Sequence, residues 1–341
     1  MTHMYNSQQN TSPEHQHSVH YIPTSLLDAL TKIETLRGNQ VIIYFGEDQP
    51  PFPKALNDED VVIMYECLRK RDRNDPLDIV LNTYGGDVVA SRKMVHLLRS
   101  LSSHLYMLLP YKARSAGTLL CLGADSIVMH PLAELSPIDP QIMSATMSVS
   151  NTSARLSSED IRAFRLMAEQ WFQIESKADG LELLQLLCQR IFPPSLAGFF
   201  RADQLLEQVA QELLQIHLPA ASEETVQHIM QTLLRGYHDH SYAITRQDAS
   251  ELGLNIAHAT IQEEQLLWTI WQQSRSYLAA AQTQHLAPGS RIDALIASSD
   301  FFAHHVVMPQ SVIAVNKGSE ENREHTSVPM LQLAHWDILR S

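Results

Sequence analysis

The sequence has little cysteine, no excess of basic residues and no long apolar run. Its cysteines, Cys67, Cys121 and Cys188, are too far apart for a metal-ligand motif and cannot all pair, which is typical of a reducing compartment. The 25 Lys and Arg residues are outnumbered by 38 Asp and Glu residues, which argues against a nucleic-acid partner. No apolar run approaches the length of a membrane span. We therefore expect a cytoplasmic protein that binds no nucleic acid and does not span a membrane.

Short apolar segments alternate with amphipathic ones between residues 40 and 131. The short segments are too short for helices and rich in β-branched residues, so we predict buried strands at QVIIYFG (40–46), LDIVLN (77–82), HLYMLLP (104–110) and DSIVMHP (125–131). The intervening segments have helical spacing, and Asn57 with Asp60 is typical of a capping box. This alternation predicts an α/β fold whose parallel strands are covered by helices.

Helical patterns dominate after a Ser/Thr-rich connection at residues 143–158. A capping-box pattern, Thr245 with Asp248, starts a later helix, and residues 291–308 predict a pair of strands or of helices. We expect a disordered polar leader (1–21), an α/β core (22–144), a helical insertion (145–236), a closing part of the core (237–280) and a C-terminal extension (281–341).

The segment YKARSAGTLLCLGAD (111–125) raises the question whether Ser115 is a nucleophile or a helix cap. A serine just before an apolar helical run is a common N-cap. However, Gly85 and Gly86 follow a predicted strand, and glycine N–H groups that no Cβ shields can stabilise an oxyanion. The helix dipole would favour negative charge on the Ser115 oxygen. Because parallel strands end at one sheet edge, the glycine pair and Ser115 can belong to one site.

Two stretches carry a resemblance to a known family. LNTYGGDVVASRKMVHLLR (81–99) followed by SAGTLLCLGADSIVMHPLAELSPIDPQ (115–141) resembles Clp-type and signal-peptide-peptidase-type serine peptidases, and most of all the serine dehydrogenase proteinase family. The shared pattern is a strand ending in Gly-Gly, then Ser-Gly-Gly-Thr, Ala-Asp and Pro-x-Asp-Pro-Gln, and this sequence departs from it at Ala116. RGYHDHSYAITRQDASELGLNI (235–256) resembles the closing segment of the family.

The resemblance implies a Clp/crotonase-like spiral of β-β-α units, here with a helical insertion, and an ATP-independent serine peptidase. It implies that Ser115 is the nucleophile. The oxyanion hole would be formed by Gly85, Gly86 and Ala116. Peptides or unfolded proteins would be the substrates of a homo-oligomer, and neither a cofactor nor a metal is expected. The sequence has no Walker A motif, so a partner would have to supply any unfolding energy.

The catalytic base does not carry over from these relatives. The Clp-type histidine falls at residues 138–140, which contain no histidine, and no lysine lies between Lys112 and Lys177. We expect His240 to be the base, with Asp139 or Asp239 orienting it. Lys177 is an alternative if the helical insertion folds back over the site, and the absence of a competent base is another.

Two other functions remain open from the sequence. Ala116, the missing middle histidine and the unmatched insertion fit an inactive pseudo-peptidase that binds peptides or assembles. The crotonase variant of the fold uses a similar oxyanion hole for acyl-CoA chemistry without a nucleophilic serine. A covalent adduct on Ser115 would separate the peptidase from both. Lys112 and Arg114, close to the serine, are expected to hold substrate or to contact a second subunit.

Overall fold

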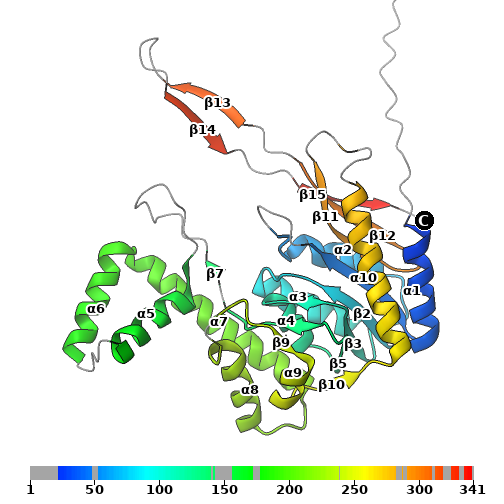
Figure 1. The fold of residues 1–341 in the computed structure, drawn as a ribbon, viewed down its shortest axis with the longest axis horizontal. Helices are drawn as coiled ribbons and strands as arrows, with labels where there is room; N and C mark the ends of the chain where they lie inside the picture. Colours follow the sequence, from blue (N-terminus) through cyan, green and yellow to red (C-terminus); the bar gives the residue numbers. More distant parts are fainter. Residues whose placement is uncertain are drawn as a thin grey trace, which may run out of the picture.

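A computed structural model describes residues 22–47, 53–139, 141–142, 156–171, 177–237, 239–281, 286, 290–308, 312–317, 324–329 and 334–339. The leader predicted over residues 1–21 and most of the Ser/Thr-rich connection lie outside these residues. The described part of the chain is a mixed α/β protein with a large central sheet (Figure 1), so the predicted fold class is confirmed.

The central sheet has eight strands in the order β10-β5-β3-β2-β1-β11-β12-β15. Its parallel part consists of β1 (Gln40–Gly46), β2 (Leu77–Asn82), β3 (Leu105–Leu109), β5 (Ser126–Met129) and β10 (Ile256–His258). The strands predicted from the short apolar segments all lie here. Every residue of β2 is buried, because helices cover both faces of the sheet.

The C-terminal segment extends the sheet with antiparallel strands. β11 (Arg291–Ala297) pairs with β1, and β12 (Phe302–Val307) and β15 (Ala334–Leu339) follow outward. The segment predicted as strands or helices is thus a pair of strands. β13 (Val312–Lys317) and β14 (Glu324–Pro329) pair with each other in a separate antiparallel hairpin.

Helices form a layer on each face of the sheet (Figure 1). α1 (Thr24–Arg37) and α10 (Ile261–Ala281) lie side by side on one face and share a core with Ile43 of β1. α2 (Asp58–Leu68), α3 (Val88–Ser100) and α4 (Ala116–Leu122) cover the other face, where Ile42 of β1 is buried. Adjacent residues of β1 therefore serve opposite cores, as a strand between two helical layers requires.

Local sequence decides where several helices begin. The Asn57 side chain accepts the N–H groups of Glu59 and Asp60, and the Asp60 side chain accepts that of Asn57, so the capping box predicted for α2 is confirmed. Thr245 and Asp248 form the same arrangement at the start of α9 (Arg246–Leu252).

A small second sheet completes the repeating unit. β4 (Lys112–Ala113) pairs with β6 (Glu134–Leu135), which pairs with β9 (Ile244–Thr245). In β3, β4 and α4 a strand of the large sheet, a short strand and a helix follow one another. Before α2 and α3 an isolated parallel bridge, at Leu56 and Thr83, stands in place of the short strand. The spiral of β-β-α units is therefore confirmed. The small sheet places the residues after β4 and β6 together at the carboxyl edge of the large sheet.

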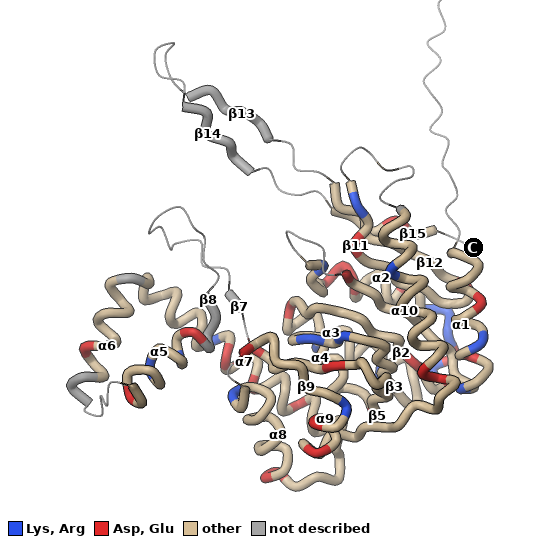
Figure 2. Tube along the Cα trace, in the orientation of Figure 1, with Lys and Arg blue, Asp and Glu red and all other residues tan. Residues whose placement is uncertain are grey.

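Helices interrupt the core between β6 and β9. They are α5 (Ser158–Trp171), α6 (Lys177–Arg190), α7 (Pro193–His217) and α8 (Glu223–Arg235), preceded by the pair β7 (Gln141–Ile142) and β8 (Leu156–Ser157). α7 packs against α3, α4 and α8, whereas α5 and α6 extend away from the sheet (Figure 1). Acidic and basic residues are interspersed over the described chain (Figure 2). No helix in the described ranges combines the length and apolar character needed to cross a membrane.

Candidate active site

Ser115 stands at the N-cap position of α4 but does not cap the helix. Its backbone has φ 52° and ψ −114°, and it is the sole non-glycine residue with positive φ in the described part of the chain. A capping serine has extended backbone and accepts an N–H from the first helical turn. Ser222 does so at α8, where its side chain accepts the N–H of Thr225, whereas the Ser115 side chain makes no such bond. Such strain costs on the order of 1–3 kcal/mol and persists where the surroundings hold it, as at catalytic turns.

The segment after β6 holds this turn in place. The Ser115 N–H donates to Oγ of Ser136 at 2.8 Å. The N–H of Ser136 donates to Oγ1 of Thr118 at 3.2 Å, and that hydroxyl lies 2.9 Å from the Ser136 carbonyl oxygen. Ser136 and Thr118 are fully buried, so these bonds form in a dry environment. The resemblance had drawn attention to this segment, but the sequence analysis missed the role of Ser136.

Gly85 and Gly86 bring backbone close to Ser115. Both have positive φ, 105° and 153°. A Cβ on Gly85 would lie 2.9 Å from Cβ of Ser115, and a Cβ on Gly86 would lie 2.3 Å from the backbone N and O of Leu56. No side chain fits at either position without a backbone shift, which explains the glycine pair.

The N–H groups around Ser115 divide into occupied and free donors. That of Gly85 donates to Oγ1 of Thr83 at 3.2 Å, and that of Ser115 is bonded to Ser136. Within the described residues, the N–H groups of Gly86 and Ala116 have no acceptor. These two N–H groups therefore differ from those of Gly85 and Ser115, which are already hydrogen-bonded.

One cavity of about 490 Å³ brings most of the expected site residues together. Ser115, Gly85, Gly86, Asp139 and His240 all line it, and the buried Ala116 follows directly after Ser115. α3 and α7 contribute an apolar wall that includes Val88, Val89, Leu205 and Leu206. We call this space the Ser115 cavity.

His240 lies in a turn before β9. Burial lowers the pKa of His240 below 6.5, the Arg114 charge lowers it further, and Asp239 opposes both effects. The imidazole is therefore neutral near pH 7. Its Nδ1 is buried and has no hydrogen-bond partner among the described residues.

The carboxylates considered as orienting groups have different surroundings. Asp139 lines the Ser115 cavity, is buried, and has Oδ1 3.6 Å from Nη2 of Arg162. Asp239 is exposed and accepts the N–H and hydroxyl of Ser241, which lowers its pKa. The structure thus places Asp139, not Asp239, on the cavity. α6, which begins at Lys177, lies far from α4 (Figure 1).

Cationic residues near the site have carboxylate partners. Lys112 and Arg114, expected to contact substrate or a subunit, both pair with Glu134, with Nζ and Nε 3.6 Å and 2.8 Å from Oε1. Lys54, which the sequence analysis missed, lines the Ser115 cavity with Nζ 2.8 Å from both oxygens of Asp60. A lone lysine in a Pro-rich loop carries no sequence signal, because only the tertiary fold brings it here.

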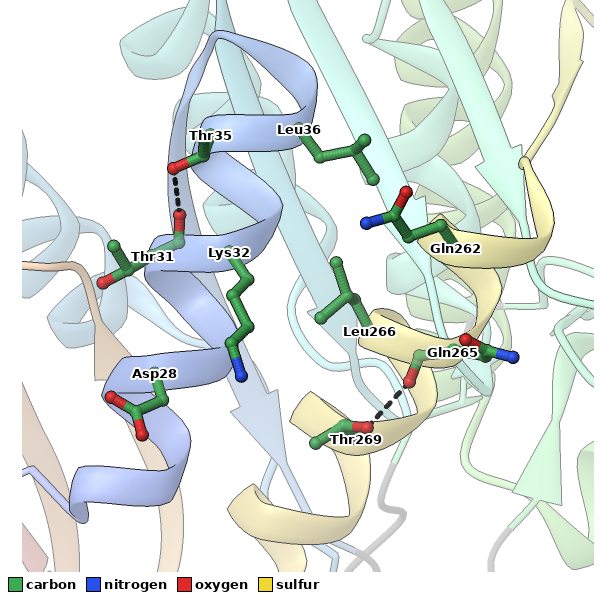
Figure 3. A pocket seen from close by; sticks show the side chains of 9 residues that line it. All are labelled: Asp28, Thr31, Lys32, Thr35, Leu36, Gln262, Gln265, Leu266 and Thr269. Carbon is green, nitrogen blue, oxygen red and sulfur yellow. Dashed lines mark hydrogen bonds between the residues drawn. The ribbon is translucent and has the colours of Figure 1, made fainter.

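A larger hollow of about 810 Å³ lies between α1 and α10 (Figure 3). Its lining residues are Asp28, Thr31, Lys32, Thr35, Leu36, Gln262, Gln265, Leu266 and Thr269. The hydroxyls of Thr35 and Thr269 donate to carbonyl oxygens of their own helices. This lining has no activated hydroxyl, thiol or imidazole, so the smaller Ser115 cavity is the candidate active site.

Comparison with known proteins identifies a family and two similar proteins. Residues 13–169 match the family of ClpP-like SDH-type serine proteinases. Two uncharacterized proteins of Methanocaldococcus jannaschii are also similar. MJ0137 is 26% identical over 223 residues, 65% of this chain and 68% of that protein. MJ1495 is 30% identical over 122 residues, 34% of this chain and 42% of that protein.

Similar solved structures include two mutants of the 1510-N membrane-bound stomatin-specific protease. The first has 15% identity and a TM-score of 0.37, covering 64% of this chain and 80% of its own. The second, in complex with a substrate peptide, has 17% identity and a TM-score of 0.37, covering 66% and 78%. A mutant of ClpP1 from Listeria monocytogenes has 14% identity and a TM-score of 0.34, covering 68% and 99%.

Proposed function

We propose that this chain, whose residues 13–169 match the family of ClpP-like SDH-type serine proteinases, is an ATP-independent serine peptidase with Ser115 as nucleophile. The observation that carries the proposal is the backbone of Ser115, strained at φ 52° and ψ −114° without serving as a cap. Strain of this kind aims a side chain outward at a sharp strand-to-helix turn.

The proposed reaction follows from the groups on the Ser115 cavity. Oγ of Ser115 attacks the carbonyl carbon of a peptide and passes its proton to the neutral ring of His240. His240 then gives this proton to the leaving amine as the C–N bond breaks, which leaves an acyl group on Ser115. Water, deprotonated by His240, hydrolyses the ester and restores the hydroxyl.

The oxyanion of each tetrahedral intermediate would be held by the N–H groups of Gly86 and Ala116. The resemblance implied Gly85 as well, but the Gly85 N–H is already bonded to Thr83, so Gly85 contributes by lacking a Cβ. Preorganised backbone donors of this kind can each contribute a few kcal/mol of transition-state stabilisation.

His240 fits the role of base because burial keeps its imidazole unprotonated near pH 7. Asp139, on the same cavity, is proposed as the carboxylate that orients the imidazolium formed during reaction, while Arg162 lies on its other side. A buried carboxylate beside the cavity would stabilise the transient positive charge on His240.

Peptides or unfolded proteins are the proposed substrates, bound in extended form through main-chain hydrogen bonds. A homo-oligomer is proposed as the assembly. The large apolar side chains of Trp171 on α5 and Phe200 on α7 are 77% and 66% exposed, and a second subunit could cover them.

A catalytically inactive, peptide-binding protein is the second candidate. The observation that favours it is the unpartnered Nδ1 of His240, because an imidazole without an orienting partner is a poorer base.

Labelling with a fluorophosphonate, located by mass spectrometry, tests both proposals. We expect an adduct on Ser115 that is absent from Ser115→Ala and strongly reduced in His240→Ala. Ser222→Ala is the matched control, because Ser222 is also an N-terminal helix residue but a true cap, and it should be labelled like the wild type. A folded wild-type protein that takes no label on Ser115 contradicts the peptidase and leaves the binding protein.

A further inference from the structure

A second cavity, of about 400 Å³, lies next to the Ser115 cavity. It is lined by Phe45, Glu47, Asn82, Tyr84, Tyr111, Lys112, Leu132, Trp268, Trp271 and Arg275. These residues come from the carboxyl ends of β1, β2, β3 and β5, from the start of β4 and from α10. Tyr84 lines both cavities and directly precedes Gly85, so the two spaces share a wall. We call this space the aromatic cavity.

Aromatic rings form an ordered group along this cavity. Trp268 and Trp271, one helical turn apart on α10, stack with centroids 4.7 Å apart and planes 11° apart. His130 stacks on Trp268 at 5.6 Å, and Tyr111 meets Trp271 edge-on at 5.3 Å. These rings form one aromatic wall of the cavity, and a further aromatic ring can pack edge-to-face against such a wall.

A buried amide fixes this arrangement before any ligand arrives. Asn82 is 2% exposed, and its Oδ1 accepts the indole N–H of Trp271 at 3.2 Å and the backbone N–H of Lys112 at 3.3 Å. Its Nδ2 donates to the carbonyl oxygen of Gly46 at 3.0 Å. The ring of Trp271 is thus held in place, and a preorganised wall reduces the entropy lost on binding.

The charges of the aromatic cavity favour a neutral ligand. Nζ of Lys112 lies 4.8 Å from the ring centroid of Tyr111, and the guanidinium of Arg275 lies 5.3 Å from that of Trp271. These cations already lie over aromatic faces, so they would repel a cationic ligand from the same faces. Each also has a carboxylate within ion-pair distance, Glu134 for Lys112 and Glu47 for Arg275, which leaves little surplus charge to attract an anion.

We propose that the aromatic cavity binds an aromatic side chain of the peptide substrate, within a few residues of the bond that Ser115 cleaves. This inference rests on the proposed peptidase function. Side chains on one face of an extended peptide repeat about every 7 Å, so two adjoining cavities can hold nearby side chains of one strand. Trp268, Trp271 and Tyr84 are then specificity-determining residues.

The binding step can be tested without hydrolysis. Full-length Ser115→Ala protein is labelled with 5-fluorotryptophan, and its four tryptophans are followed by fluorine NMR, with each signal assigned by a Trp→Phe substitution. On addition of N-acetylphenylalanine amide, the signals of Trp268 and Trp271 should shift, while those of Trp171 and Trp336 should not. N-acetylalanine amide should need an at least about tenfold higher concentration for the same shift. Equal responses to both amides, or uniform shifts of all four signals, overturn the proposal.

A second experiment separates this inference from the proposed function. Cleavage sites in an unfolded protein are mapped for the wild type and for Trp271→Leu, with Trp171→Leu on exposed α5 as the matched control. Wild type and control should cleave near aromatic residues, and Trp271→Leu should lose this preference. Ser115-dependent cleavage without aromatic preference refutes only the aromatic cavity. Shifted Trp268 and Trp271 signals with no label on Ser115 refute only the peptidase.

Discussion

The N–H of Ser115 donates a hydrogen bond to Oγ of Ser136 at 2.8 Å, across two turns that each follow a strand of the small sheet. This bond joins the turn that carries the proposed nucleophile to the segment that carries Asp139. If Ser115 is the nucleophile, Ser136 would be a positioning residue, because its hydroxyl contacts the backbone of Ser115.

Ser136→Ala is expected to lower both stability and reactivity. It leaves a partly buried N–H without its acceptor, which costs on the order of 1–3 kcal/mol of unfolding free energy. The rate of fluorophosphonate labelling at Ser115 should fall as the strained turn relaxes. Urea unfolding and labelling kinetics measure the two effects, and Ser100→Ala on the exposed side of α3 should change neither. An unchanged labelling rate in a destabilised Ser136→Ala protein would assign Ser136 a purely structural role.

The glycine pair should be intolerant of even a methyl group. In Gly85→Ala the new Cβ meets Cβ of Ser115 at 2.9 Å, so we expect labelling of Ser115 to be lost. Gly38→Ala is the matched control, since Gly38 also has positive φ, 71°, but has no neighbouring atom within 4 Å of the new Cβ. It should cost only about 1–2 kcal/mol of left-handed strain and leave labelling intact. Equal labelling of both variants would argue against close packing at Gly85.

Labelling of Ser115 should depend on pH through His240. Because burial and Arg114 lower the pKa of His240 below 6.5, its basic form is present at pH 7 and is lost as the pH falls through that lowered pKa. The labelling rate should therefore fall with decreasing pH around a midpoint below pH 6.5; we call this fall the acidic limb of the pH–rate profile. A limb well above pH 6.5 would show that another group is the base.

Arg114→Gln should move that limb to higher pH. It removes a positive charge that lowers the pKa of His240. Arg99→Gln, which breaks an ion pair with Asp125 outside the Ser115 cavity, should leave the limb in place. The measurement is the labelling rate as a function of pH for the three proteins.

His217 should make the unfolding free energy depend on pH. Its Nδ1 lies 2.6 Å from the Ala124 carbonyl oxygen and its Nε2 accepts the N–H of Asn255 at 2.9 Å, so the buried ring is neutral and burial lowers its pKa. Below its unfolded value near 6.5 the unfolded chain binds more protons than the folded one, so stability falls as the pH drops toward the lowered folded-state pKa.

Urea unfolding between about pH 7 and about pH 5 measures this dependence. His217→Gln should be less stable at pH 7 and should show a weaker decline on acidification. His228→Gln, at an exposed position of the neighbouring α8, should behave like the wild type. If the unfolding free energies of His217→Gln and the wild type fall equally on acidification, titration of His217 does not contribute to the pH dependence of stability.

The elements that could be predicted from sequence are those whose cause is local. The capping boxes at Asn57 and Thr245 follow from side chains three residues apart, and the parallel strands follow from short apolar segments. The two-residue strands β4, β6 and β9 have no such signal, because only their mutual pairing stabilises them. The length and apolar content of residues 291–308 fit strands and helices equally well. Their strand structure depends on the pairing of β11 with β1, which the local sequence does not reveal.

The residues of the candidate site also differ in whether a local motif or only the tertiary fold identifies them. Ser115 and the glycine pair stand in contiguous motifs, and the family match over residues 13–169 confirms the resemblance they carried. His240 and Asp139 are brought to one cavity only by the small sheet, so their roles stay predictions. The Ser136 hydroxyl contacts Ser115, and the Lys54 ammonium contacts Asp60. No rule of sequence spacing predicts either contact.

The pairing of β1 with β11 has a consequence for how the chain reaches its fold. Ile43 forms its parallel pair with β2 nearby in sequence, but its antiparallel partner, Ala297, is synthesised much later. Until then the β-branched segment Val41–Phe45 offers an open strand edge to any other chain. Such distant pairing is slow to form and exposes the chain to aggregation. A protein proposed to degrade unfolded chains thus passes, during its own synthesis, through a state that resembles its substrates.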